Sequence, residues 1–100
     1  MKGAKTVWIT GASSGIGEAL ALTYNAKGYR TILSARRSEV LESIQKKLTH
    51  PEHSYLLPLD LEQHENAEAW FHQASAFTGS IDILINNAGM GHMGTVVEME

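Results

Sequence analysis

Three glycines follow a short apolar run near the start of the chain. Residues 6–10 read Thr-Val-Trp-Ile-Thr, and Gly11, Gly15 and Gly17 come soon after them. A strand that breaks into glycines and opens a helix can bind a pyrophosphate, because the first amides of the helix and the positive end of its dipole face the anion. Gly11 would provide the sharp turn, Gly15 the close approach of the backbone to a phosphate, and Gly17 the tight packing of helix on sheet. The pattern predicts a phosphate-binding turn.

A pair of arginines follows the second predicted strand. Arg36 and Arg37 come about 19 residues after Gly17. In an NAD-binding fold this strand end usually carries an acidic residue that accepts a hydrogen bond from the ribose 2′-hydroxyl. A guanidinium would instead attract a 2′-phosphate, which a carboxylate would repel. The position favours NADP(H) over NAD(H); the alternative is that both arginines are solvated side chains ahead of a helix.

Asp60 lies at the end of the third predicted strand, in the run Pro-Leu-Asp-Leu of residues 58–61. Ligands of parallel sheets bind at the carboxyl ends of the strands, so this carboxylate is expected on the adenine side of the crevice. It could accept a hydrogen bond from the adenine amino group. The alternative is that Asp60 caps the next helix, and the two roles are compatible.

Residues 86–89 read Asn-Asn-Ala-Gly and follow the fourth predicted strand. Asparagine is a poor strand former, so two in succession after an apolar run indicate a specific requirement. Their amides can tie neighbouring strands together, while Ala88 and Gly89 allow the backbone to approach a ribose. The alternative is a plain turn.

Alternating strands and helices would hold these four segments at one edge of a sheet. The apolar patterns predict strands over residues 5–10, 30–34, 54–59 and 81–85, and helices over residues 15–27, 38–48 and 62–77. Strict alternation predicts an α/β fold with a doubly wound parallel sheet and right-handed crossovers. A complete sheet of this kind needs roughly twice this length. Residues 1–100 are therefore expected to be the N-terminal part of a single domain in a longer protein.

Local signals predict where the helices begin and end. Gly28 and Gly79 are expected to end the first and third helices, and Ser38 to cap the second. Residues 96–100 resemble the start of a further helix. The first helix has apolar residues at helical spacing, namely Ile16, Ala19, Leu20 and Tyr24.

Composition excludes several classes of protein. The chain has 100 residues, a hydrophobic share of 43% and a net charge of −3, which is typical of a globular fold. Eight basic residues against eleven acidic ones argue against nucleic acid as the main partner. The absence of cysteine excludes disulfides and thiolate metal sites. No apolar stretch approaches the ~18 residues of a membrane span, so a cytoplasmic location is expected.

The four motifs together resemble the short-chain dehydrogenase/reductase superfamily. The glycine turn after Thr10, the basic residue at 36, the Asp60-Leu61 pair and the Asn-Asn-Ala-Gly run occur in that family's order and spacing, over essentially the whole chain. The resemblance implies a Rossmann-type domain that uses NADP(H) to interconvert a carbonyl and an alcohol substrate. It also implies homo-oligomers through later helices.

The resemblance further implies which residues bind the cofactor. Asp60 and Leu61 would meet the adenine, and Arg36 the 2′-phosphate with Arg37 assisting. Asn86, Ala88 and Gly89 would lie along the adenosine ribose and towards the nicotinamide, and Asn87 would be structural. The pyrophosphate and the adenosine side would be held by the first loop, namely Gly11, Ser13, Ser14, Gly15, Ile16 and Gly17.

The family's catalytic residues are not in this chain. They are a Tyr-x-x-x-Lys pair with a serine and an asparagine, downstream of residue 89, and no tyrosine here has a lysine four residues later. No catalytic residue is therefore assigned, and residues 1–100 alone are expected to be inactive. Two alternatives are a non-catalytic NADP(H)-binding or sensing module, and a truncated chain that does not fold stably because its fourth strand is an exposed edge.

Other patterns resemble functional sites by their spacing. Ser43 and Lys46 have the Ser-x-x-Lys spacing of acyl-transfer enzymes but lie on a solvated helix face. No metal site is predicted, although one helix carries His64, Glu68 and His72 at a spacing that could hold zinc. A substrate pocket could be bordered by residues after the fourth strand, namely Met90, His92 and Met93.

Overall fold

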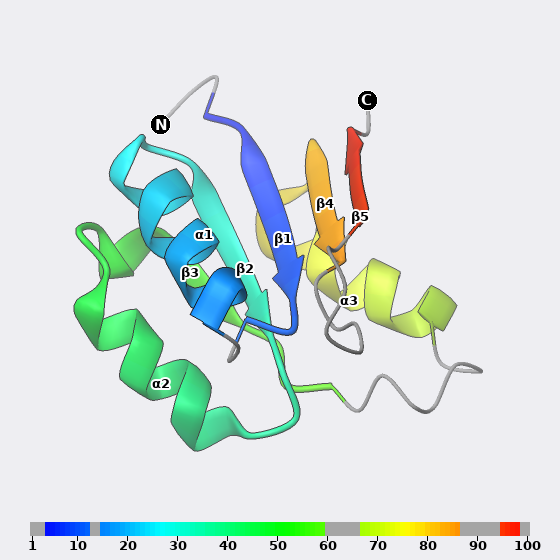
Figure 1. Cartoon of the computed structure of the whole chain (residues 1–100). Coiled ribbons are helices and arrows are strands. Elements are labelled where there is room, and N and C mark those ends of the chain that lie inside the picture. Colours follow the sequence, from blue (N-terminus) through cyan, green and yellow to red (C-terminus); the bar gives the residue numbers. More distant parts are fainter. Residues whose placement is uncertain (1–3, 13–14, 60–66, 87–94, 99–100) are drawn as a thin grey trace.

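A five-stranded sheet forms the centre of the molecule. The computed structural model describes residues 4–12, 15–59, 67–86 and 95–98. The strand order is β3-β2-β1-β4-β5, in which the first four strands are parallel and β5 runs antiparallel to β4 (Figure 1). The strands are β1 (Thr6–Thr10), β2 (Arg30–Ser34), β3 (Ser54–Leu56), β4 (Ile83–Asn86) and β5 (Thr95–Glu98).

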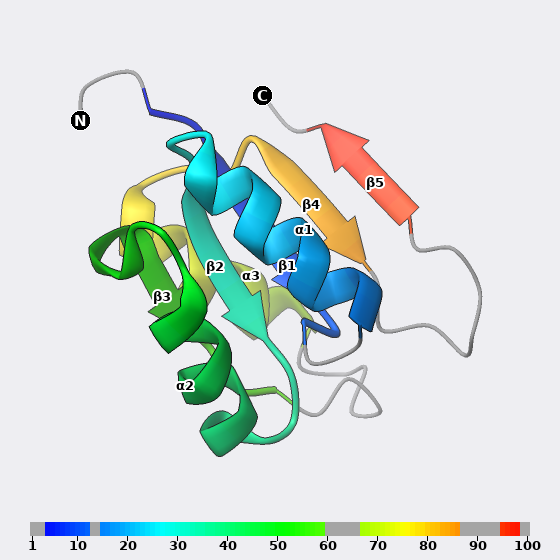
Figure 2. The same ribbon diagram turned by 60° about the vertical axis from the view of Figure 1, so that its left-hand side comes forward.

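Helices cover both faces of the sheet. Helices α1 (Gly15–Ala26) and α2 (Ser38–Lys47) lie on one face, and α3 (Ala67–Thr78) lies on the other (Figures 1 and 2). A short 3-10 helix, η1 (Pro51–His53), leads into β3. The predicted α/β fold with a parallel sheet is thereby confirmed, and its order of 3-2-1-4 is that of the first half of a Rossmann-type sheet.

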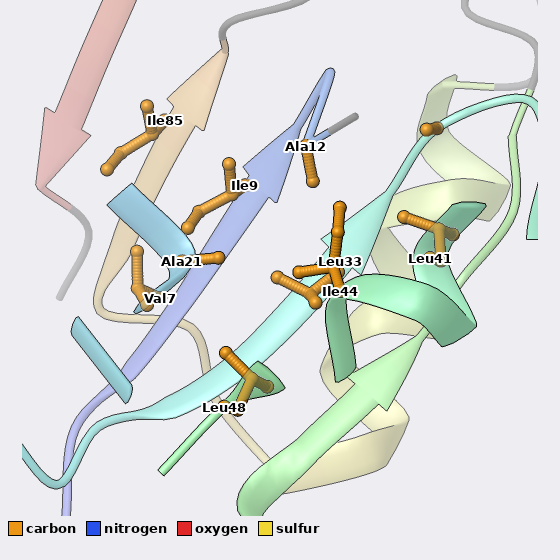
Figure 3. Close-up of a cluster of buried hydrophobic side chains, with 10 residues drawn as sticks. Val7, Ile9, Ala12, Ala21, Leu33, Leu41, Ile44, Leu48 and Ile85 are labelled. Carbon is orange, nitrogen blue, oxygen red and sulfur yellow. The ribbon is translucent and has the colours of Figure 1, made fainter. Parts of the chain in front are cut away.

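Two hydrophobic clusters hold the layers together, because successive residues of a strand face opposite sides. On the α1 and α2 side, Ile9 and Leu33 pack with Leu41 and Ile44 of α2, all at most 2% exposed (Figure 3). On the α3 side, Trp8 and Ile32 lie with Ala74 of α3. The strands β1 and β2 are consequently buried on both faces, as expected for parallel strands between helix layers.

Helix α1 packs on the sheet by its small residues. Its buried positions are Gly17, Ala21 and Asn25, whereas Ile16 is 63% exposed. The apolar residues at helical spacing do not form the buried face, since Ala19 is also exposed and Leu20 and Tyr24 are only half-buried. Gly17 and Ala21 on the buried face are small, which lets the helix lie close to the strands.

The start of α2 also differs from the prediction. Arg37, with an extended backbone, is the residue that caps the helix, and its carbonyl accepts a hydrogen bond from the Leu41 amide at 3.3 Å. Ser38 is already the first helical residue, and no side-chain hydrogen bond caps this end. Gly28 and Gly79 end α1 and α3 as predicted, with φ angles of 96° and 87° that favour glycine.

Strand β3 is shorter than predicted, although its pairing continues beyond it. The amides of Leu57 and Leu59 donate hydrogen bonds of 2.9 Å to the carbonyls of Leu33 and Ala35. Residues 60–66, the predicted start of the third helix included, lie outside the described residues. None of the described helices is both long and apolar enough to cross a membrane.

The predicted helix start at residues 96–100 is wrong. Residues Thr95–Glu98 form strand β5, which pairs antiparallel with β4 from Ile83↔Glu98 to Asn86↔Thr95. A short apolar run does not distinguish helix from strand by its periodicity, and the residues Thr-Val-Val are β-branched types that favour strands. Pairing also satisfies backbone groups on the side of β4 that faces away from β1.

Candidate dinucleotide-binding site

The carboxyl ends of three strands meet at one edge of the sheet. Thr10, the last residue of β1, lies in register between Ser34, the last of β2, and Asn86, the last of β4. After β1 the chain moves outward to β2 and β3 and then returns to β4 on the other side of β1. This reversal of strand order is the topological switch point, where open α/β sheets bind their ligands.

The glycine turn leaves the sheet at this edge. Gly11 has a φ of 66°, in the left-handed region that favours glycine. The next amide, that of fully buried Ala12, donates a 3.0 Å hydrogen bond to the carbonyl of Ser34. The turn is therefore fastened to the end of β2 before α1 begins, which supports the predicted role of Gly11 as the turn residue.

Gly15 is the first residue of helix α1, and nothing in the described part of the chain requires glycine at this position. Its φ is not positive, and a Cβ added to it would meet no heavy atom within 4 Å. Neither backbone strain nor packing excludes a side chain here, and glycine lowers helix stability by up to ~1 kcal/mol relative to alanine. Exposed Ile16 follows it, and buried Gly17 faces the sheet. The amino end of α1 thus presents open backbone, which fits a phosphate group.

The two arginines extend from the end of β2 into solvent. Arg36 and Arg37 are both exposed, and among the described residues neither side chain has an ion-pair partner. Ala35, which precedes them, is 7% exposed and its carbonyl holds the Leu59 amide at 2.9 Å. The segment just before Asp60 is thereby fixed beside the segment that carries the guanidinium groups.

A side-chain hydrogen bond joins β1 to β4 at the switch point. The Thr10 hydroxyl donates to Oδ1 of Asn86 at 2.9 Å. The prediction that an asparagine amide of residues 86–87 ties neighbouring strands together is confirmed for Asn86. Asn86 is itself exposed at this edge, where the cofactor contact expected of it stays a prediction.

Several predicted site residues lie outside the described residues, so their placement is not part of the site geometry: Ser13, Ser14, Asp60, Leu61, Ala88 and Gly89. The same holds for His64 and for the residues expected at a substrate pocket, Met90, His92 and Met93. Over the described ranges, no group of three histidine or acidic side chains is placed to hold a metal ion.

Sequence reasoning missed two polar residues behind the site. Trp8 donates from Nε1 to the Ser34 hydroxyl at 2.8 Å, and both side chains are buried. A tryptophan in a buried strand needs a partner for its N–H. The sequence thus indicates that Trp8 needs a partner, but its pairing with Ser34 depends on the register of β1 with β2.

Known proteins match the chain along nearly its whole length. The model of the short chain dehydrogenase family matches residues 5–100. A dehydrogenase/reductase SDR family protein 7-like from Anopheles gambiae is 41% identical over an alignment of 98 residues that covers 90% of this chain and 30% of that protein. The chain therefore spans about a third of the length of the curated relatives it matches.

Solved structures agree with this match. A variant of the actinorhodin polyketide ketoreductase with NADPH superposes with a TM-score of 0.80 at 28% identity, over 90% of this chain and 35% of that one. A metagenomic short-chain oxidoreductase in complex with NADP gives 0.79 at 32% identity, over 87% and 40%. With the parallel strands, the glycine turn and the switch point in place, the chain belongs to the short-chain dehydrogenase/reductase family and corresponds to the N-terminal part of its members.

Proposed function

We propose that this chain binds NADP(H) in a protein that transfers hydride between the nicotinamide and a carbonyl or alcohol substrate. The observation that carries the proposal is the open backbone at Gly15. The fold needs no glycine at that position, yet the position lies at the amino end of α1, beside the switch point. A pyrophosphate that contacts this backbone would account for the glycine.

Two observations support NADP(H) over NAD(H). Exposed Arg36 follows the end of β2 without an acidic residue at its side, since Ala35 and Arg37 flank it. A guanidinium recognises phosphate by charge-assisted, forked hydrogen bonds. Two of the superposed structures hold NADPH or NADP. Arg37, exposed beside it, would assist.

The described residues would bind and orient the cofactor rather than move protons. When bound, NADP(H) supplies the hydride donor or acceptor at its nicotinamide. The amides at the start of α1 would hold the pyrophosphate, Arg36 would hold the 2′-phosphate, and Asn86 would stand at the ribose. Proton transfer to or from the substrate would fall to residues beyond these 100.

A non-catalytic NADP(H)-binding or sensing module is the second candidate. Residues 1–100 support it as well as the enzyme, because they hold the proposed cofactor-binding residues and no tyrosine followed by lysine four residues later. Both candidates predict binding, but only the enzyme predicts turnover. The two can therefore be separated by measuring both properties on one preparation.

The test is a fluorescence titration of the protein with NADPH and NADH, followed by an assay for oxidation of bound NADPH by aldehydes and ketones. Tighter binding of NADPH than of NADH is expected. Oxidation that needs the segment after residue 100 would support the enzyme, whereas binding without oxidation by the longest natural form of the protein would support the sensing module. Absence of dinucleotide binding would refute both.

A further inference from the structure

We propose that the buried hydrogen bond between Trp8 and Ser34 positions the end of β2 for recognition of the cofactor's 2′-phosphate. The inference rests on the proposed function, because it requires Arg36 to meet that phosphate. Trp8 Nε1 donates to Ser34 Oγ at 2.8 Å, and the two residues are 5% and 0% exposed. Neither would touch the cofactor, so both are positioning residues.

Three predicted cofactor-binding segments meet at residues 34–35. The first contact is made by Ser34. Its carbonyl accepts the Ala12 amide of the glycine turn at 3.0 Å. The next carbonyl, that of Ala35, accepts the Leu59 amide at 2.9 Å, just ahead of Asp60. Arg36 follows directly. A shift of residues 34–35 would therefore move the 2′-phosphate contact relative to the pyrophosphate turn and to the adenine segment.

Trp8 can hold Ser34 in place because its indole is itself fixed. The ring lies in the cluster between the sheet and α3, with Ile32 and Ala74, and its centroid is 6.5 Å from that of Phe71. Ladder pairing of β2 with β1 ends at Thr10↔Ser34. The Trp8 bond thus fixes the last paired residue of β2 from the α3 side of the sheet, while the Ala12 bond fixes its backbone.

The geometry matters because a forked guanidinium–phosphate contact depends on orientation more than a diffuse charge interaction does. If the end of β2 loosens, Arg36 keeps its charge but loses its fixed position. The affinity for NADPH should then fall, whereas the affinity for NADH, which lacks the 2′-phosphate, should stay the same. The selectivity between the two cofactors is therefore the property that this hydrogen bond should control.

The experiment measures the dissociation constants of NADPH and NADH by fluorescence titration for the wild type and for Ser34→Ala, Trp8→Phe and the double variant. Each single substitution should lower the preference for NADPH about fivefold, and the double variant should lower it no further, because both remove the same bond. If a variant is partly unfolded, its apparent affinities for NADPH and NADH fall by the same factor, so the ratio of the two dissociation constants does not change. The ratio therefore separates positioning from plain destabilisation.

Two further variants serve as controls. Ser34→Thr keeps the hydroxyl and should keep the preference for NADPH. Ser54→Ala removes a hydroxyl at the opposite, amino end of β3, where it accepts from Gln45 Nε2 at 2.7 Å, and should leave the ratio unchanged. Trp8→Phe retains an aromatic ring in the cluster, so it provides the measurement if Ser34→Ala does not fold.

The outcomes separate this inference from the proposed function. An unchanged ratio in folded Trp8→Phe, with wild-type protein that prefers NADPH, would overturn the positioning role alone. Wild-type protein that binds neither cofactor would overturn the proposed function and the inference with it. The expected result is a lowered preference for NADPH in Trp8→Phe and a wild-type preference in Ser34→Thr. This result would support both the positioning role and the proposed function.

Discussion

Thr10 and Asn86 lie 76 residues apart in the sequence, and a 2.9 Å hydrogen bond from the Thr10 hydroxyl to Asn86 Oδ1 joins them at the ends of two adjacent parallel strands. Between these two residues lie α1, β2, α2, η1, β3 and α3. The bond therefore joins two distant parts of the sequence at the point where the strand order reverses. It also fixes the first residue before the glycine turn relative to the first asparagine of the Asn-Asn-Ala-Gly run.

Removing the Thr10 hydroxyl should destabilise the protein. Thr10 is 4% exposed, so Thr10→Val leaves Oδ1 of Asn86 without this donor while keeping the β-branched shape. We expect the free energy of unfolding to fall by about 1 kcal/mol, the usual net contribution of a hydrogen bond, because this bond is part-buried. Urea denaturation followed by circular dichroism measures the change.

Thr23→Val is the matched control for this substitution. The Thr23 hydroxyl donates to the Ala19 carbonyl at 2.9 Å on the exposed side of α1, where water can replace the bond. We expect a change within ~0.5 kcal/mol. Equal losses of stability in the two variants would contradict the importance given to the Thr10–Asn86 bond.

Gly15→Ala should separate stability from cofactor binding. The added Cβ meets no atom of the described chain, and alanine favours a helix over glycine, so stability should stay the same or rise by up to ~1 kcal/mol. NADPH affinity should nevertheless fall at least tenfold, because the Cβ would occupy the approach of the pyrophosphate. The two properties are measured by thermal unfolding and by fluorescence titration.

Gly28→Ala should behave in the opposite way. Gly28 has a φ of 96°, so a side chain strains the backbone there, and we expect a loss of about 1–2 kcal/mol in stability. The residue lies at the end of α1 away from the strand tips, so the affinity of the folded protein for NADPH should not change. Gly15→Ala with normal NADPH affinity would remove the main support for the phosphate-binding turn.

The end of β2 should set the choice between the two cofactors. Replacing Ala35 by aspartate and Arg36 by isoleucine provides a carboxylate that can accept a hydrogen bond from the ribose 2′-hydroxyl of NAD(H). It also removes the guanidinium. We expect NADPH affinity to fall about 10- to 150-fold, the equivalent of one charge-assisted contact of roughly 1.5–3 kcal/mol, and NADH affinity to rise. Titration of both cofactors measures the shift.

Lys46→Ala is the control for loss of positive charge. Lys46 is exposed in the last turn of α2, far along that helix from Arg36. Its loss changes the net charge by one without altering the end of β2, so cofactor selectivity should stay at the wild-type value. Unchanged selectivity in the Ala35 and Arg36 double variant would refute the role proposed for Arg36.

The sequence was sufficient to predict the elements that have strong local signals. The glycines at 28 and 79 end helices where predicted, because their positive φ angles are a backbone requirement that a local pattern reveals. The parallel arrangement of β1 to β4 also followed, because strict alternation of strands and helices predicts a parallel sheet. The Asp82 carboxylate, the exception in an apolar run, proves to accept the Thr6 amide at 2.8 Å at the start of β1.

Features that depend on tertiary packing were not predictable in the same way. The inner face of α1 consists of Gly17, Ala21 and Asn25 because the helix lies close to the sheet, and apolar periodicity pointed to larger neighbours. Strand β5 forms by pairing with β4, and no pattern within residues 95–98 reveals this contact with another segment. The Trp8–Ser34 bond likewise needs the register between two strands before it can be recognised.

Asn25 should be the most costly polar residue to replace outside the candidate site. It is fully buried, and its carboxamide pairs with the backbone of His50: Oδ1 accepts the His50 amide at 2.7 Å and Nδ2 donates to the His50 carbonyl at 3.0 Å. The side chain thus fixes the connection between α2 and η1 to α1. Asn25→Leu keeps the branching at Cγ but leaves the His50 amide unpaired, while the His50 carbonyl still accepts the His53 amide at 2.9 Å. We therefore expect the free energy of unfolding to fall by about 1–3 kcal/mol.

Thr31→Val tests whether this loss comes from the His50 pairing. Asn25 Nδ2 also lies 3.4 Å from the Thr31 hydroxyl, a long contact that should contribute little. Thr31→Val should therefore cost less than ~1 kcal/mol in urea denaturation. Because Asn25 and His50 lie at the amino end of the sheet, opposite the strand tips, the NADPH affinity of folded Asn25→Leu should equal that of the wild type. A stability loss as large in Thr31→Val as in Asn25→Leu would show that the Thr31 contact, and not the His50 backbone, is what Asn25 supplies.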